Sequence, residues 1–120
     1  MKKTAITTDQ APAPSGAYSQ ALVAGPFVFL SGQIALDAAG HPVQGDIVVQ
    51  TVQVIENLKA VLAAAGLTLK DIVKTTAYLS DLADFADFNR IYSEFFPDLP
   101  PARTTIQAAG LPRGAALEMD

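Results

Sequence analysis

The segment from Asp46 to Ala65 constrains the fold more than any other part of the sequence. Asp46 is suited to cap a first helical turn, and Gly66 follows the segment as a stop signal. A helix with one buried side is predicted here, because residues suited to burial recur at intervals of three and four. These residues are Ile47, Thr51, Val54, Ile55, Leu58, Val61, Leu62 and Ala65.

The rest of the chain alternates between a second helix and short extended segments. The second helix is predicted from Asp84 to Phe96, with Phe85, Phe88, Ile91, Tyr92 and Phe95 on one side and Pro97 ending it. Two helices on one face of one mixed sheet form the simplest two-layer α+β arrangement, which leaves the other sheet face uncovered. The extended segments are predicted at 27–30, buried on both faces, at 34–36 as its continuation past a bend at Gly32, and at 73–79, 102–109 and 116–120.

Length and hydropathy predict one domain, spanning 1–120, that associates with other copies. The chain has 120 residues, half of them hydrophobic, and its mean hydropathy is +0.28. So small a domain cannot hide all of this apolar surface alone. We find no apolar run near the roughly 20 residues that a membrane-spanning helix needs, and none follows the two N-terminal lysines as in a signal peptide. We therefore expect a subunit interface, and no membrane, to cover the surplus.

The composition also argues against several kinds of chemistry. The chain has no cysteine, which excludes disulfides, thiolate catalysis and cysteine metal sites, and which is compatible with a cytoplasmic location. A single histidine, His41, is too little for a His-rich metal site or a Ser/His/Asp triad. The formal net charge is -4 with only 8 Lys+Arg, which argues against generic nucleic-acid binding.

Two charged residues near the C-terminus are candidates for a site. Arg103 lies where Pro100-Pro101 leads into an extended segment, and an arginine fork fits a small carboxylate bidentately. Glu118 is flanked by apolar residues, so strand alternation places it on the face opposite its neighbours, where a carboxylate can activate a water. Local sequence alone favours a surface or ion-paired role for Arg103 and a solvated strand position for Glu118.

Four further residues are weaker candidates. The Tyr18 phenol is suited either to a substrate hydrogen bond or to half-buried packing. Ser31 and Gly32 fit either a ligand-binding turn or a bulge at a strand end. Asn89 is an unusual residue inside a helix, which indicates a specific hydrogen bond, more often structural than catalytic.

Taken together, segments along nearly the whole chain resemble the reactive intermediate deaminase (Rid) family in order and spacing. The C-terminal motifs are the most specific: Pro101-Ala102-Arg103, Leu111-Pro112, Gly114-Ala115 and Leu117-Glu118-Met119. The other matching segments are Ser15 to Ala21, Leu30 to Ile34, Asn57 to Leu62 with Ala64-Ala65-Gly66, Asp71 to Thr76, and Asp84-Phe85 with Asn89, Tyr92, Phe95 and Phe96.

The resemblance implies a chorismate-mutase-like α+β fold and a homotrimer with three sites at its subunit interfaces. It implies neither a metal nor an organic cofactor. In the family, the arginine matching Arg103 binds the substrate carboxylate, and the glutamate matching Glu118 positions the attacking water. The matches of Tyr18, Ser31 and Gly32 line the pocket and that of Asn89 lies near it, while Thr105 stands where the backbone N–H contacts the ligand.

The activity implied by the resemblance is hydrolysis of short imines and enamines, such as 2-iminobutanoate and 2-iminopropanoate, to 2-keto acids and ammonia. A non-catalytic trimer that binds keto acids remains an alternative, as do an endoribonuclease or translation inhibitor and a chaperone-like role. Family members usually continue for several apolar residues past the position of Asp120. We therefore expect Glu118 to lie near a fraying chain end.

Overall fold

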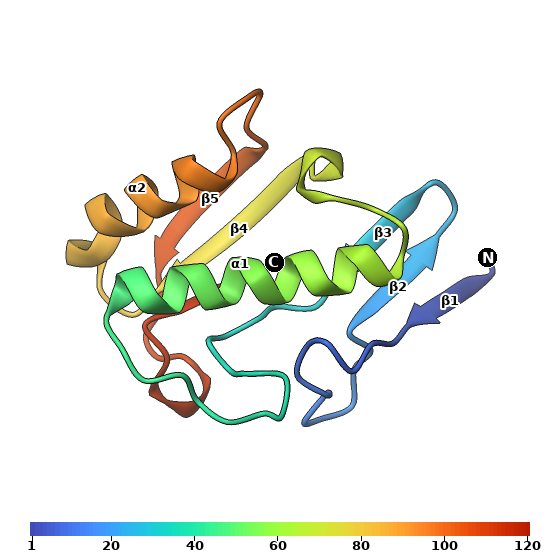
Figure 1. Cartoon of the computed structure of the whole chain (residues 1–120), viewed down its shortest axis with the longest axis horizontal. Helices are drawn as coiled ribbons and strands as arrows, with labels where there is room; N and C mark the ends of the chain where they lie inside the picture. The colour runs from blue at the N-terminus through green and yellow to red at the C-terminus, as the bar shows by residue number, and fades with distance from the viewer.

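Six strands and two helices follow one another along the chain in a computed structural model that describes all 120 residues (Figure 1). Three single-turn 3-10 helices lie in the connections, at Leu69–Asp71, Leu82–Asp84 and Pro112–Gly114. The main elements are β1 (Lys3–Ile6), β2 (Ala21–Ala24), β3 (Phe27–Leu30), α1 (Ile47–Ala64), β4 (Lys74–Leu79), α2 (Phe85–Phe95), β5 (Ala102–Gln107) and β6 (Leu117–Met119).

The strands form two three-stranded sheets that continue into each other. β1, β2 and β3 make an antiparallel meander. The second sheet has the order β5-β4-β6 and is mixed, since β4 pairs with β5 in parallel and with β6 antiparallel. The chain leaving β3 joins the two sheets, because the backbone of Gln33 exchanges two hydrogen bonds with that of Met119.

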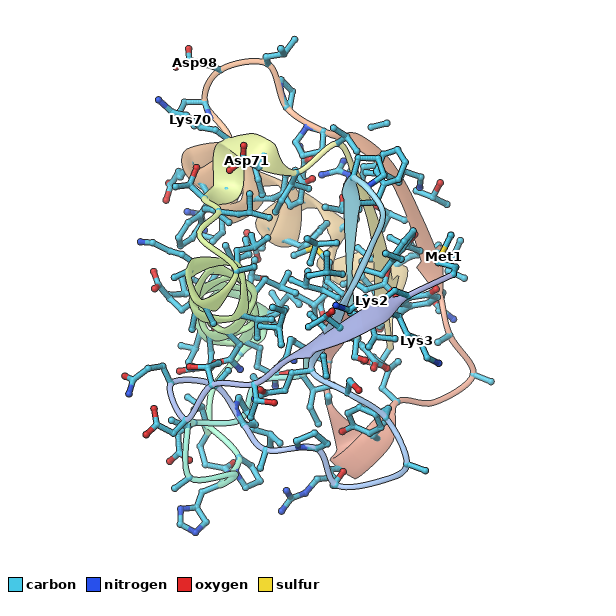
Figure 2. The ribbon with its side chains drawn as sticks, turned by 90° about the vertical axis from the view of Figure 1, so that its right-hand side faces the viewer. Met1, Lys2, Lys3, Lys70, Asp71 and Asp98 are labelled. Atoms are coloured by element: carbon cyan, nitrogen blue, oxygen red, sulfur yellow. The ribbon has the colours of Figure 1, made fainter.

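Both helices lie on one side of this strand layer. Figure 2 shows α1 nearly end-on, with the strands beside it and no helix beyond them. The core between the layers holds 12 buried residues drawn from α1, α2, β4, β6 and the loops beside them. This is the chorismate-mutase-like α+β fold, with two helices on one face of mixed strands, as the sequence predicted.

The predicted long helix is confirmed as α1. Its buried residues include seven of the eight in the predicted stripe, Ala65 being the exception. The Asp46 side chain accepts a hydrogen bond of 3.1 Å from Val49 N, which is the predicted cap. By length and composition alone α1 is apolar enough to cross a membrane, contrary to the expectation from the sequence. In the fold, its buried face packs on the strands and on α2.

The other face of the strands is open in the single chain. Register places Tyr78 of β4 beside Ile106 of β5 and Glu118 of β6 on this open face. Residues one position along, including Ala77, Thr105 and Met119, point toward the helices.

Two expectations about the first third of the chain are wrong, and two strands in it were missed. β3 is not buried on both faces, because Phe27 and Phe29 lie on the open face and are 59% and 63% exposed. Segment 34–36 makes a single isolated bridge, between Leu36 and Pro42, and no strand. β1 and β2 were missed, since their runs of four residues are too short to show a clear period.

The expectation of a frayed end at Glu118 is also wrong. Asp120 exchanges two backbone hydrogen bonds with Thr76, of 2.9 and 3.1 Å, one pair beyond the β4–β6 ladder. Glu118 therefore lies inside a paired strand.

Candidate active site

Arg103 lies on β5, the edge strand of the mixed sheet, on the face that α2 covers. It is registered with Thr75 of β4. Its guanidinium carbon lies 5.5 Å from the ring centroids of Phe85 and Phe88 and 4.7 Å from that of Tyr92. All three rings belong to α2, so the arginine is wedged between a strand edge and an aromatic helix face.

The Arg103 guanidinium has no ion-pair or hydrogen-bond partner in the chain. The three ion pairs of the structure involve His41, Lys59 and Arg90. A half-buried arginine normally has an anionic partner, because burying an unpaired charge is costly. Arg103 is therefore a free cation poised for an anion that is not part of this chain.

The edge of β5 adds backbone donors beside this cation. Ala102 N donates to Val73 O and Ala108 N donates to Leu79 O, so the even-numbered positions of β5 bond to β4. In a parallel ladder the odd positions then direct their N–H groups to the opposite edge, which no strand covers. The N–H groups of Arg103 and Thr105 are thus available to a ligand.

Two more predicted residues lie close to Arg103 in the fold. Asn89 is one helical turn beyond Phe85 on α2. Thr105 Oγ1 is the only buried side-chain polar atom in the structure without a hydrogen-bond partner. We call Arg103, Thr105 and Asn89 the arginine cluster.

Glu118 lies on the open face, packed against bare backbone at Gly32. A Cβ atom built on Gly32 would lie 2.6 Å from Glu118 Oε2 and 3.1 Å from its Cδ. No side chain fits in that space unless the carboxylate moves. The glycine is required here because the carboxylate approaches the backbone so closely.

The pKa of Glu118 is raised above its ordinary value. Burial of the carboxyl is the larger cause, and repulsion from Asp120 on the same strand face adds to it. The pKa of Asp120 is also raised by burial, against the attraction of Lys74. A carboxylate with a raised pKa is a stronger base, which suits proton transfer from water near neutral pH.

Tyr18 and Ser31 lie on neighbouring segments near Gly32. Ser31 N donates to Gln20 O at 3.0 Å, and Ser31 Oγ donates to Ser19 O at 2.6 Å, so this hydroxyl proton is already used in the fold. The Tyr18 hydroxyl accepts a hydrogen bond from Ser15 N at 3.2 Å, and its ring is half exposed. We call Glu118, Gly32, Ser31 and Tyr18 the glutamate cluster.

A single chain keeps the two clusters apart. Arg103 shares a face with Thr75 and Ala77, whereas Glu118 shares the opposite face with Tyr78. The predicted residues therefore form two half-sites on opposite faces of one sheet. A hollow of about 480 Å³ between α1 and the segment that carries Thr8 and Gln10 contains none of them.

Sequence reasoning missed two features of these half-sites. It assigned the α2 aromatic residues to the core, although three of their rings line the Arg103 guanidinium. It also missed Asp120 as a neighbouring charge, which alternation from Glu118 could have placed on the same face. No group of three or more His, Asp or Glu side chains is placed to share a metal ion.

Comparison with known proteins gives the family. The family model described as Endoribonuclease L-PSP matches residues 8–120. A RutC family protein of Pyrococcus abyssi is 49% identical over 100% of this chain and 95% of its own length. Reactive Intermediate Deaminase A, chloroplastic, of Arabidopsis thaliana is 44% identical over 100% of this chain and 65% of its own length.

Solved structures agree with these relatives. The crystal structure of yeast Mmf1 superposes with a TM-score of 0.96 at 40% identity, covering 98% of this chain and 94% of that one. The chain belongs to the Rid family of proteins, which includes reactive intermediate deaminases.

Proposed function

We propose that this protein hydrolyses short 2-imino acids, and the enamines in equilibrium with them, to 2-keto acids and ammonia. The observation that carries the proposal is Arg103, a half-buried cation with no partner in its own chain and with free backbone donors beside it. The similarity to a plant reactive intermediate deaminase supports the same reaction.

The substrate carboxylate binds at the arginine cluster in this proposal. The planar fork of Arg103 matches both oxygens of a carboxylate, and the N–H of Thr105 supplies a further donor. The unpartnered Thr105 hydroxyl belongs to the residue two positions along β5, on the same face as Arg103. Fixing the carboxylate orients the adjacent imine carbon and lowers the entropic part of the barrier.

The glutamate cluster supplies the water. Glu118 accepts a proton from water as the oxygen bonds to the imine carbon, and the proton passes on to the substrate nitrogen. The hydroxyl of the resulting amino alcohol then gives its proton, by way of Glu118, to the amine nitrogen as the carbon–nitrogen bond breaks, which releases ammonia and leaves the keto acid. The raised pKa of Glu118 favours this exchange of protons.

The two half-sites meet in this proposal when copies associate. A ring of three copies, each placing its open sheet face and β5 edge against the next, brings Arg103 of one copy to Glu118 of a neighbour. Such a head-to-tail ring closes by three-fold rotation and forms three equivalent sites. It would also cover Phe27, Phe29 and Ile106, which are exposed in the single chain.

The test follows an imine as it forms. Threonine dehydratase releases 2-iminobutanoate, and semicarbazide traps the fraction that survives. Wild type should suppress trapping, and Arg103→Ala should lose about 30-fold or more in rate, since removing a buried charge partner costs roughly 2–5 kcal/mol. Arg90→Ala is the matched control, because Arg90 is an exposed α2 arginine paired only with Asp87.

Two outcomes would replace the proposal. If a folded trimer binds 2-ketobutyrate in calorimetry but does not suppress trapping, the protein is a keto-acid-binding protein. The name of the family model raises endoribonuclease as the other alternative. RNA cleavage that survives repurification and is lost in Arg103→Ala would establish it, against the formal net charge of -4.

A further inference from the structure

The α2 helix and its C-cap residue Phe96 carry a continuous row of aromatic rings, three of which line Arg103. The ring centroids of Phe85 and Phe88 are 6.4 Å apart, those of Phe88 and Tyr92 5.6 Å, and those of Tyr92 and Phe96 4.6 Å. We call Phe85, Phe88, Tyr92 and Phe96 the aromatic row. Its members are one turn apart, so they form one ridge along the helix.

The aromatic row is fixed to the sheet next to Arg103. The Tyr92 hydroxyl and Thr75 Oγ1 form a buried hydrogen bond of 2.8 Å. Thr75 is the β4 residue in register with Arg103. Phe88 is fully buried and Tyr92 nearly so, and these two rings therefore have a fixed position relative to the guanidinium.

We propose that the aromatic row positions the Arg103 guanidinium for the substrate carboxylate, with Phe85 closing the outer side; this rests on the proposed function. A ring face attracts the cation without using its N–H groups. All five guanidinium donors remain free for the ligand, whereas an Asp or Glu partner would occupy two of them and compete with the substrate. The rings take the place of that anionic partner.

Phe85 is the residue through which this can be tested without unfolding the protein. It is 37% exposed, so Phe85→Leu keeps an apolar side chain and removes the ring without opening a buried cavity. Phe85→Tyr restores a ring and serves as the conservative rescue. Phe95→Leu is the matched control, because Phe95 is on the same helix and its ring does not line Arg103.

The experiment compares the four variants Phe85→Leu, Phe85→Tyr, Phe95→Leu and Arg103→Ala with wild type. Calorimetry measures binding of 2-ketobutyrate, and steady-state kinetics separate KM from kcat for 2-iminobutanoate. NMR of the Arg103 Nε–H group gives a ligand-free readout, because ring currents shift protons that lie over a ring face upfield. We expect Phe85→Leu to bind roughly 3- to 30-fold more weakly, with most of the change in KM.

The outcomes separate this inference from the proposed function. Weaker binding and a downfield Nε–H shift in Phe85→Leu, both reversed in Phe85→Tyr and absent in Phe95→Leu, support it. Wild-type binding and an unmoved Nε–H signal in Phe85→Leu overturn it while the proposed function stands, provided Arg103→Ala has lost binding. Equal losses in the two leucine variants overturn it as a general effect on α2. Arg103→Ala that binds like wild type overturns both.

Discussion

The two half-sites differ in how the fold holds their charged groups. Arg103 is surrounded by aromatic rings on the helix-covered face and makes no polar contact with its own chain. Glu118 lies on the open face against the bare backbone of Gly32, with a second carboxylate nearby. One half-site presents an unpaired cation, and the other presents a carboxylate that burial makes more basic.

This difference fits the proposal that a complete site needs both half-sites. A carboxylate beside Arg103 in the same chain would neutralise the cation before a substrate arrived. Placing Glu118 on the opposite face prevents that pairing within one chain. Association of copies then assembles cation and base around a ligand, in the trimer that we propose.

The largest effect should come from the base. Glu118→Gln keeps the shape of the side chain but cannot accept a proton, so we expect kcat to fall by about 10²- to 10⁴-fold with little change in KM. Steady-state assays with 2-iminobutanoate measure this. Glu56→Gln, an exposed change on α1, is the control and should keep full activity. Equal activity of the two variants would remove Glu118 from the mechanism.

The next effect distinguishes the open face from the helix face. Ile106 on the open face is 44% exposed and Val52 on α1 is 38% exposed. Ile106→Arg places a charge in the proposed interface, so we expect a single chain of 12.6 kDa and loss of turnover. Val52→Arg should remain a trimer. Light scattering after size exclusion measures both masses, and a trimeric Ile106→Arg would contradict the proposed interface.

A smaller effect concerns the hydrogen bond that fixes the aromatic row. Tyr92→Phe leaves Thr75 Oγ1 buried without a partner, and we expect the free energy of unfolding to fall by about 1–3 kcal/mol. Adding Thr75→Val removes the unpaired group and should restore most of the loss. Urea unfolding of both variants gives the comparison. If the double variant is no more stable than Tyr92→Phe, the hydrogen bond is not the cause.

The smallest effect is a shift with pH. Asp120→Asn removes the charge that helps raise the pKa of Glu118, so that pKa should fall toward its ordinary value. The acidic limb of kcat/KM then moves to lower pH, since Glu118 acts as the carboxylate. The free energy of unfolding should also depend on this pKa. Because the pKa of Glu118 is higher in the folded than in the unfolded chain, its protonated form stabilises the fold at pH values below the unfolded pKa, and this stabilisation is lost as the pH rises through the folded pKa. Asp120→Asn should therefore lose less stability on going from acid to neutral pH.

A matched change checks that this shift is local. Asp98→Asn removes one negative charge from an exposed loop at one end of the molecule (Figure 2). Its pH profile should match that of wild type. A similar shift in both variants would mean that overall charge, and not Asp120, tunes Glu118.

The sequence predicted the helices and the C-terminal strands because each has a strong local period or stop signal. Alternation also placed Glu118 correctly on the face opposite its neighbours. β1 and β2 were missed because they are short and acquire their order from pairing with each other and, for β2, with β3. The error for Phe27 and Phe29 has a different cause: an apolar run predicts burial but does not distinguish the core from a surface that another copy would cover.

The resemblance supplied candidate residues for the site one by one, but not their arrangement in space. The resemblance named Arg103 and Glu118 together, whereas only strand register shows that they face opposite ways. The contact of the aromatic rings with Arg103 could not be predicted, because helical spacing marks the same positions for the core and for such a contact.

The most direct test of the central claim is complementation between two inactive variants. Arg103→Ala and Glu118→Gln are coexpressed with different tags, and trimers that carry both tags are isolated. If each site takes Arg103 from one copy and Glu118 from its neighbour, every trimer with both tags should regain one of its three sites, which is about a third of wild-type activity. Each variant alone should stay inactive. Mixed trimers without activity would contradict the account, because they would show that both residues of a site come from one chain.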